Sequence, residues 1–356
     1  SGVLTKLLIT LPTRKSPSSK GFNEDSGFGR ARAPNFGSQK RENFCRSMIR
    51  ALACRSIIRQ RFLKLKPKLN IQKMSTHNVQ HIKTVAVGGS TGNMELRVVP
   101  MFSDNYGYIV IDKASMQAAV VDPADHEVML GALKTMPEIT LTQVWCTHKH
   151  DDHAGGNEAF AAAYPGIKIY GPVHENETVP AISHPCEDEA TFQLGTNTQV
   201  RVLFVPCHTR GHIIYFADAG NARVLAAGDT LFTGGCGRFF EGTAAEMLAN
   251  MDRMRQLPHD TVCCPAHEYT QGNFAFNASI DSRLKTNHAE IVAKREKGEF
   301  TVPTTIGAEK VHNLFMRTHD TDVQELVKRA AGPAYADKEL DAEMTMTLLR
   351  EMKNSF

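Results

Sequence analysis

Apolar and polar positions follow two different periods along the middle of the chain. Residues 96–102 and 108–112 are rich in valine and isoleucine and predict two strands, joined by the turn signal Ser-Asp-Asn-Tyr-Gly. Residues 118–123 and 141–147 predict two further buried strands, and residues 127–136 between them carry a helical period. Strands that alternate with helices in this way indicate an α/β fold.

The composition excludes several classes of protein. The chain has 356 residues, of which 42% are hydrophobic and 22% charged, as is typical of globular proteins long enough for two domains. It contains no run of 18 apolar residues, so we expect no transmembrane helix and no membrane partner. Eight cysteines without a Cys-x-x-Cys pair are too sparse for a disulfide framework, and we expect reduced thiols.

Charge is distributed unevenly, although the net charge is only +3. Residues 1–73 hold 17 Lys and Arg against three acidic residues, whereas the rest of the chain holds 24 basic and 35 acidic residues. Within the basic part, residues 47–64 place apolar side chains between arginines, as a basic amphipathic helix does. The acidic remainder argues against nucleic acid as a partner.

Three interpretations stay open for the basic N-terminal extension, which we assign to residues 1–74. An Arg-rich, Ser-rich and acid-poor segment is typical of an organelle transit peptide. A disordered basic tail, or translated upstream sequence without a role, would have the same composition, and a nucleic-acid-binding arm is the third reading. Because translation can also begin at Met74, we expect a mitochondrial long form and a cytoplasmic short form.

A dense group of metal-ligating side chains follows the predicted strand at residues 141–147. It reads His-Lys-His-Asp-Asp-His, with three histidines and two aspartates within six residues. Alternate side chains of an extended segment point the same way, so His148 and His150 can share one cation. A turn then directs Asp152 and His153 toward a second position. Imidazole and carboxylate together suit zinc, iron or manganese better than calcium or magnesium.

Three more candidate ligands follow apolar strands elsewhere, namely His208, Asp229 and His267. A single histidine or aspartate at a strand end is usually structural. With the first four, however, they make seven ligands, which is enough for two metals with three each and one shared. Asp229 is the natural bridge, because a carboxylate has two oxygens whereas a neutral imidazole binds one metal.

The pattern from His148 to His267 resembles that of the metallo-β-lactamase superfamily. This resemblance implies an αββα sandwich, in which two mixed sheets are flanked by helices and the metals lie at one edge. It also implies how the ligands are divided. The first metal would be held by His148, His150 and His208, and the second by Asp152, His153 and His267, with Asp229 bridging them.

Within that superfamily the chain is most similar to the glyoxalase II, or hydroxyacylglutathione hydrolase, family, over about residues 95–356. Short motifs carry the likeness, including Phe-Ser-Asp-Asn-Tyr from residue 102 and Gly-Cys-Gly-Arg-Phe-Phe-Glu-Gly from residue 235. The resemblance implies a catalytic domain over residues 95–268 and a helical glutathione-binding domain over residues 269–356. Helical patterns agree with the second domain, at residues 287–297, 321–331 and 339–353.

The resemblance also implies five substrate-binding residues. Tyr269 keeps the tyrosine that the family has beside the metal-binding histidine. Arg350 and Lys353, three residues apart, share one helix face and suit the glycine carboxylate of glutathione. Arg238 stands where the family usually has lysine, so the charge is kept. Phe240 stands where tyrosine is common, so one hydroxyl is lost and its polar role is in doubt.

The implied activity is hydrolysis of an S-2-hydroxyacylglutathione, typically S-D-lactoylglutathione, to glutathione and D-lactate in methylglyoxal detoxification. Two divalent ions, most simply zinc and alternatively iron or manganese, would lower the pKa of a bridging water toward about 7. The hydroxide, held beside Asp152 and Asp229, would attack the thioester carbonyl. His212, Asp122 and Asp104 are expected to support the ligands rather than to act as catalysts.

Two other readings were weighed against this hydrolase. A mononuclear-iron persulfide dioxygenase of the same superfamily would need only His148, His208 and Asp229. A non-catalytic binding protein on this scaffold would be expected to have lost a ligand, whereas all seven are present. The expected partner is a small glutathione thioester, bound by a monomer.

Overall fold

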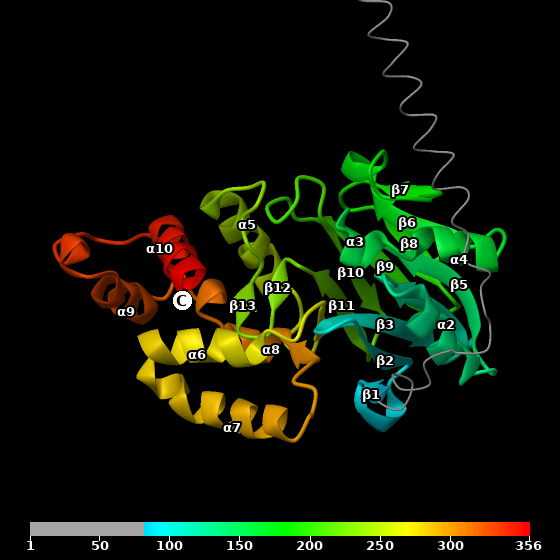
Figure 1. Cartoon of the computed structure of the whole chain (residues 1–356), viewed down its shortest axis with the longest axis horizontal. Coiled ribbons are helices and arrows are strands. Elements are labelled where there is room, and N and C mark those ends of the chain that lie inside the picture. Colours follow the sequence, from blue (N-terminus) through cyan, green and yellow to red (C-terminus); the bar gives the residue numbers. More distant parts are fainter. Residues whose placement is uncertain (1–81) are drawn as a thin grey trace, which may run out of the picture. The chain divides into compact units, whose positions relative to one another are not determined.

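The computed structural model describes residues 82–356 (Figure 1). The predicted basic extension at residues 1–74, with its amphipathic stretch at 47–64, lies outside the described residues. The described residues all belong to one compact unit. Among residues 82–356, no helix is both long enough and apolar enough to cross a bilayer.

The first sheet has seven strands, which pair antiparallel from β1 to β4 and parallel from β4 to β7. In spatial order they are β1 (Lys83–Val87), β2 (Met94–Met101), β3 (Asn105–Asp112), β4 (Gln117–Val121), β5 (Thr140–Trp145), β6 (Lys168–Pro172) and β7 (His184–Cys186). The predicted hairpin is confirmed as β2 and β3, but β3 begins at Asn105 and the turn is therefore shorter than expected. β1 adds a strand N-terminal to residue 95.

The second sheet has six strands, all antiparallel except for the parallel pair β11 and β14. In spatial order they are β15 (Thr304–Thr305), β14 (Val262–Pro265), β11 (Arg223–Gly228), β10 (Ile213–Asp218), β9 (Thr198–Phe204) and β8 (Thr191–Leu194). A separate short hairpin consists of β12 (Leu231–Phe232) and β13 (Gly235–Cys236). Because β15 comes from the C-terminal part of the chain, that part contributes a strand to the sandwich.

Helices flank both sheets. The helices of the described residues are α2 (His126–Lys134), α3 (Asp151–Ala154), α4 (Asn157–Ala163), α5 (Ala244–Arg255), α6 (Thr270–Ile280), α7 (Lys285–Glu296), α8 (Ile306–His312), α9 (Thr321–Ala331) and α10 (Ala342–Ser355). Figure 1 shows α2 and α4 beside the first sheet, and α5 with α6 to α10 beyond the second. Sequence patterns predicted α2, α7, α9 and α10 within a few residues, and these helices are confirmed.

Three apolar layers hold this arrangement together. Met129 of α2 and Phe160 of α4 pack on the outer face of the first sheet. Between the sheets, Trp145 stacks on Tyr215 with ring centroids 5.4 Å apart. The third layer joins the second sheet to α5 and the C-terminal helices around Phe315. The order helix, sheet, sheet, helix confirms the expected αββα sandwich with a C-terminal helical region.

A buried carboxylate, Asp112, ties the first sheet to the second. It accepts hydrogen bonds from the Ser115 backbone N–H at 2.9 Å and the Ser115 hydroxyl at 3.0 Å, in the turn after β3. It also accepts from the Asn197 N–H at 2.9 Å, just before β9, and from the hydroxyl of Thr198, the first residue of β9, at 3.0 Å. Burial alone would raise the pKa of Asp112, but these donors outweigh it and lower the pKa below its ordinary 3.8.

Replacing Asp112 by Ala is therefore expected to lower the free energy of unfolding at pH 7 by about 3 kcal/mol, because several donors lose a charged acceptor. A carboxylate with a depressed pKa stabilises the fold above its unfolded pKa and loses that effect as the pH falls. The difference between variant and wild type should hence narrow below about pH 4. Urea unfolding at several pH values measures both quantities.

Asp337→Ala is the control, since Asp337 is exposed. Its free energy of unfolding should stay within about 0.5 kcal/mol of wild type. An Asp112→Ala variant as stable as this control would contradict the role assigned to Asp112.

Candidate metal centre and substrate pocket

All seven predicted ligands lie where strands end on one edge of the sandwich. Buried apolar residues hold each strand up to that edge, so the first residues beyond it have a defined position. At the end of β5, His150 is the N-cap residue of the short α3, and this turn brings Asp152 and His153 back toward the strand end. The other ligands follow β9, β11 and β14, and they are His208, Asp229 and His267.

The first group of ligand atoms consists of three imidazole nitrogens. His148 Nε2 lies 2.9 Å from His150 Nδ1, and His208 Nε2 lies 3.2 Å from the same atom. All three belong to a cluster whose ligand atoms lie within 4.8 Å of one another. The structure thus brings together the three residues that the resemblance assigned to one metal.

The second group combines one carboxylate with two imidazoles. Asp152 Oδ2 lies 3.7 Å from His153 Nε2 and 3.5 Å from His267 Nε2. These residues form a second cluster with ligand atoms within 4.8 Å of one another. They are the three residues that the resemblance assigned to the other metal.

Asp229 lies between the two groups and turns one oxygen toward each. Its Oδ2 is 3.1 Å from His208 Nε2, whereas its Oδ1 is 3.4 Å from both His153 Nε2 and His267 Nε2. Gly228 before it has a φ of +48°, and a Cβ there would lie 2.7 Å from Thr147 Oγ1. Only glycine therefore allows β11 to deliver Asp229 to this point.

Two buried atoms show that this arrangement fits a cation. His153 Nε2 and Asp229 Oδ1 both face the cluster and make no hydrogen bond. Leaving such atoms buried without a partner is costly, and a divalent cation between them would satisfy both. Imidazole nitrogens together with carboxylate oxygens are a donor set for zinc and related transition metals.

Hydrogen bonds on the far side of the imidazoles fix which nitrogen faces the cluster. His267 Nδ1–H donates to Asp104 at 2.7 Å, and His208 Nδ1–H donates to the Arg238 carbonyl at 3.1 Å. Each of these rings consequently presents an Nε2 lone pair to the cluster. Asp104 thus supports a metal ligand, as its place in the sequence predicts.

Asp122 serves two of the ligands at once. Its Oδ2 accepts from His153 Nδ1–H at 3.0 Å and from the Thr147 hydroxyl at 2.7 Å. The Thr147 oxygen in turn lies 3.0 Å from His148 Nδ1 and can accept its proton. Asp122 has a φ of +45°, a strained conformation for an aspartate, which the contacts with these ligand-bearing residues explain.

Electrostatics within the cluster favour ionised carboxylates, a neutral His148 and a protonated His153. Burial lowers the pKa of His148 well below 6.5, and the neighbouring histidines lower it further. Burial would raise the pKa of Asp229, but His153 and His208 outweigh it and lower the pKa below 3.8. Burial likewise opposes the charged form of His153, yet Asp229 and Asp122 raise its pKa to about 9. A cation would replace the proton on His153.

A cationic cavity of about 450 Å³ adjoins the cluster and is lined by four of the five predicted substrate-binding residues. Tyr269 connects the two, because its ring stacks on His267 with centroids 4.7 Å apart. Arg350 is buried, donates to the Cys236 carbonyl at 3.3 Å and leaves its Nε without a partner. The other two are Arg238 and Lys353.

Phe240, the fifth predicted substrate-binding residue, does not line that cavity. Its ring lies on the other group of ligands, with centroids 5.1 Å from His208 and 6.2 Å from His150. The side chain is 62% exposed. Phe240 thus presents an apolar surface at the mouth of the cluster, on the side away from His267.

Sequence reasoning missed two residues that position the ligands. Asn105 donates from Nδ2 to Asp152 Oδ2 at 3.0 Å, and it lies inside the quoted Phe-Ser-Asp-Asn-Tyr motif without having been given a role. Glu175 is buried and accepts the backbone N–H groups of Lys149 at 2.9 Å and Gly211 at 3.0 Å. It joins the loop of His148 to the loop after β9, and no local pattern points to it.

Comparisons with known proteins agree with this geometry. Residues 105–267 match the family model of the metallo-β-lactamase superfamily, and residues 268–356 match that of the hydroxyacylglutathione hydrolase C-terminus. Hydroxyacylglutathione hydrolase of Gloeobacter violaceus is 40% identical over 261 residues, which are 71% of this chain and 96% of that protein. The enzyme of the same name from Maricaulis maris is 39% identical over 264 residues, 73% of this chain and 98% of that protein. The chain therefore belongs to the hydroxyacylglutathione hydrolase family of the metallo-β-lactamase superfamily.

Proposed function

We propose that this chain is a thioesterase that hydrolyses S-2-hydroxyacylglutathione, with S-D-lactoylglutathione as the typical substrate, to glutathione and a 2-hydroxy acid. The observation that carries the proposal is the cationic cavity of Arg238, Arg350 and Lys353 directly beside the His/Asp cluster. Relatives named hydroxyacylglutathione hydrolase support the same activity. Release of D-lactate from that substrate would be a step in the disposal of methylglyoxal.

Two divalent ions, most simply zinc, are the cofactors that we propose, with iron or manganese as alternatives. His148, His150 and His208 would hold one ion, and Asp152, His153 and His267 the other, because the ligand atoms converge in these two groups. Asp229 would contact both through its two oxygens. When bound, such ions supply a water of lowered pKa as nucleophile and a Lewis acid for the carbonyl oxygen.

The chain's own residues hold and orient the reacting groups. Asp122, Asp104 and the Arg238 carbonyl keep the ligand imidazoles in the tautomer that points Nε2 inward. Asn105 holds the carboxylate of Asp152 from the side. The leaving thiolate of glutathione needs no proton donor from the chain, because a thiol has a pKa of only about 8.5.

Glutathione fits the cavity by charge, because it carries two carboxylates. The unpartnered Arg350 Nε offers a buried charged donor, and Lys353 offers a second charge on the same face of α10. Because Tyr269 lines the cavity and stacks on His267, glutathione bound there would have its sulfur close to the ligand cluster. The cavity and the cluster together thus suit a glutathione thioester.

A mononuclear-iron dioxygenase is less well supported by the geometry. It would leave Asp152, His153 and His267 without a role, although all three have an outer hydrogen-bond partner that fixes their orientation.

We also propose that the protein acts as a monomer, and that a form beginning at Met74 is cytoplasmic while the long form is mitochondrial.

The first test follows thiol release from S-D-lactoylglutathione by the zinc-loaded full chain. We expect turnover that a chelator abolishes and added Zn²⁺ restores. His267→Ala should lower kcat/KM on the order of 100-fold or more, because it removes a ligand of the nucleophile-generating site. The matched control is His184→Ala, an exposed histidine of β7, which should keep wild-type activity. A folded, fully metallated chain without turnover would refute the proposal.

The second test separates substrate binding from chemistry. Lys353→Ala removes a charged donor from the cavity, and such contacts contribute about 1.5–3 kcal/mol. The KM should therefore rise by roughly 10-fold or more, while kcat changes little because the metal ligands are untouched. Glu351→Ala, an exposed change on the same helix, serves as control and should leave both constants alone. A fall in kcat without a change in KM would contradict the assignment.

The third test uses pH. Burial, with a smaller effect of Arg350, lowers the pKa of Lys353 from 10.5 to about 8. Its ammonium is charged below that pH and neutral above it, so kcat/KM should fall as the pH rises through about 8. Lys353→Arg should remove this fall, since a guanidinium stays charged over the whole range. An identical profile in both proteins would exclude Lys353 as the titrating group.

A further inference from the structure

The short hairpin of β12 and β13 stands apart from both large sheets. It lies between two residues of the site, since Asp229 precedes it and Arg238 follows it. No strand of either large sheet pairs with it, so groups outside those sheets must satisfy the backbone carbonyls and N–H groups that the pairing of β12 with β13 leaves free.

Side chains of the C-terminal helical region supply these bonds. Every carbonyl from Phe232 to Cys236 accepts from one of them. Asn313 donates to the carbonyls of Phe232 at 3.4 Å and Gly235 at 2.9 Å. Asn273 donates to the Thr233 carbonyl at 3.1 Å, and Asn277 donates to the Gly234 carbonyl at 2.8 Å. Arg350 donates to the Cys236 carbonyl at 3.3 Å.

Glu309 of α8 accepts a hydrogen bond from the hairpin, whereas the other side chains donate to it. Its Oε2 accepts from the Gly234 N–H at 2.9 Å and from Asn313 Nδ2 at 2.9 Å, while Oε1 accepts from the Thr304 hydroxyl at 2.8 Å. The side chain is buried, and burial raises its pKa to about 7. We call Asn277, Asn313 and Glu309 the hairpin clamp; none of the three lines the cationic cavity.

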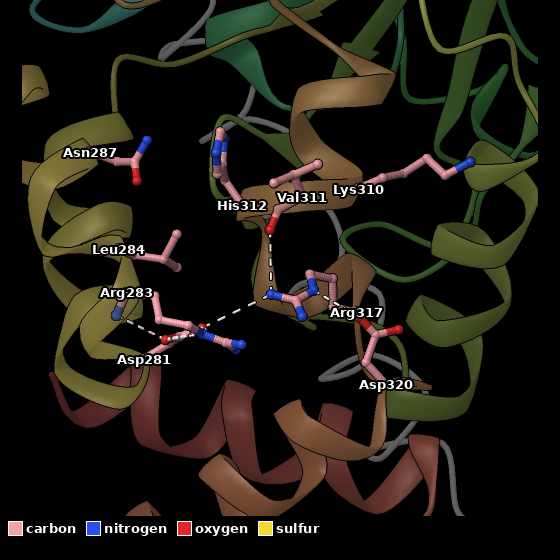
Figure 2. Close-up of a pocket in the computed structure, with 9 residues that line it drawn as sticks. All are labelled: Asp281, Arg283, Leu284, Asn287, Lys310, Val311, His312, Arg317 and Asp320. Carbon is pink, nitrogen blue, oxygen red and sulfur yellow. Dashed lines mark hydrogen bonds and ion pairs between the residues drawn. The ribbon is translucent and has the colours of Figure 1, made fainter.

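The end of α8, directly before Asn313, is held by contacts with Arg317, which Figure 2 shows. Arg317 donates to the Val311 carbonyl at 3.4 Å, at the end of α8, and lies 4.0 Å from the buried carboxylate of Asp281. Arg283 binds the same carboxylate at 2.7 Å. Because Asn313 follows α8 directly, these contacts hold the base of its side chain in place.

The end of the hairpin bears directly on two ligands. A Cβ on Gly237 would lie 1.9 Å from the Asp229 carbonyl oxygen and 3.1 Å from His208 Nδ1, so the backbone there packs closely on both residues. Arg238, the next residue, accepts the proton of His208 Nδ1 through its carbonyl. A shift of the hairpin would therefore move Asp229 and remove the hydrogen bond that fixes the tautomer of His208.

We infer that the hairpin clamp is a positioning device through which the C-terminal helices hold Asp229 and His208 in place for metal binding. The helical region would then serve the metal centre as well as the glutathione moiety. This inference rests on the proposed function in one respect, namely that the cluster binds divalent ions.

Asn277→Ala tests the inference in the full chain, stripped of metal and titrated with Zn²⁺ against a chromophoric chelator. The substitution removes the donor to Gly234 O, and we expect zinc affinity to fall about tenfold, as for other supports of metal ligands. The absorption spectrum of the Co²⁺-loaded protein should change as well. The KM for thioester at saturating zinc should stay within about twofold, because the cavity is intact.

The matched control is Asn93→Ala, which loses the same kind of bond, from Nδ2 to the Ala219 carbonyl at 3.0 Å, away from the site. Its zinc affinity and Co²⁺ spectrum should equal those of the wild type. Wild-type zinc affinity and spectrum in a folded Asn277→Ala protein would overturn the inference.

A pair of substitutions at Glu309 decides the matter independently if Asn277→Ala does not fold. Glu309→Gln keeps an oxygen for Gly234 N–H and Asn313, so zinc affinity should remain at the wild-type level. Glu309→Ala removes it, and affinity should fall about tenfold. Equal affinities in the two variants would overturn the inference. A wild-type chain that binds zinc but does not cleave thioesters would contradict the proposed function only.

Discussion

The carboxylate of Asp229 is the point on which the whole centre depends. Its two oxygens face different groups of imidazoles, at 3.1 Å on one side and 3.4 Å on the other, so both groups form around a single side chain. A carboxylate in this buried position keeps its charge only because His153 and His208 lower its pKa. The attraction is mutual, since Asp229 raises the pKa of His153. A bound cation would take over the role that the proton on His153 has without it.

Around Asp229, the strands fix where each ligand lies, and hydrogen bonds on the outer side of the imidazoles fix how each ring is rotated. Each strand brings a ligand to the edge of the sandwich, but a strand end does not determine how an imidazole is rotated. That rotation follows from partners such as Asp122 and Asp104, which bind the Nδ1–H groups. The strained residue Asp122, with its φ of +45°, is therefore one that orients a metal ligand, namely His153.

The C-terminal helices connect the two halves of the proposed function. Arg350 belongs to both, because it lines the cationic cavity and also donates to the Cys236 carbonyl of the short hairpin. The hairpin leads to Arg238, whose side chain lines the cavity while its carbonyl orients His208. Arg350 and Arg238 thus contribute both to the charge of the cavity and to the geometry of the metal ligands.

The sequence by itself determined the features that depend on local pattern. Alternating strands and helices indicated an α/β fold, and side chains at strand ends, such as His148 and His267, indicated the ligands, because both signals extend over only a few neighbouring residues. The sandwich itself was implied by the resemblance of the ligand pattern to that of the metallo-β-lactamase superfamily. The sequence did not predict α6, because its buried positions include the polar residues Asn273 and Asn277 and so lack a regular apolar period. Only the tertiary structure decided what those asparagines bind. Their partners lie at Thr233 and Gly234, some forty residues away, and a hydrogen bond over that separation exists only after the helix has packed against the hairpin.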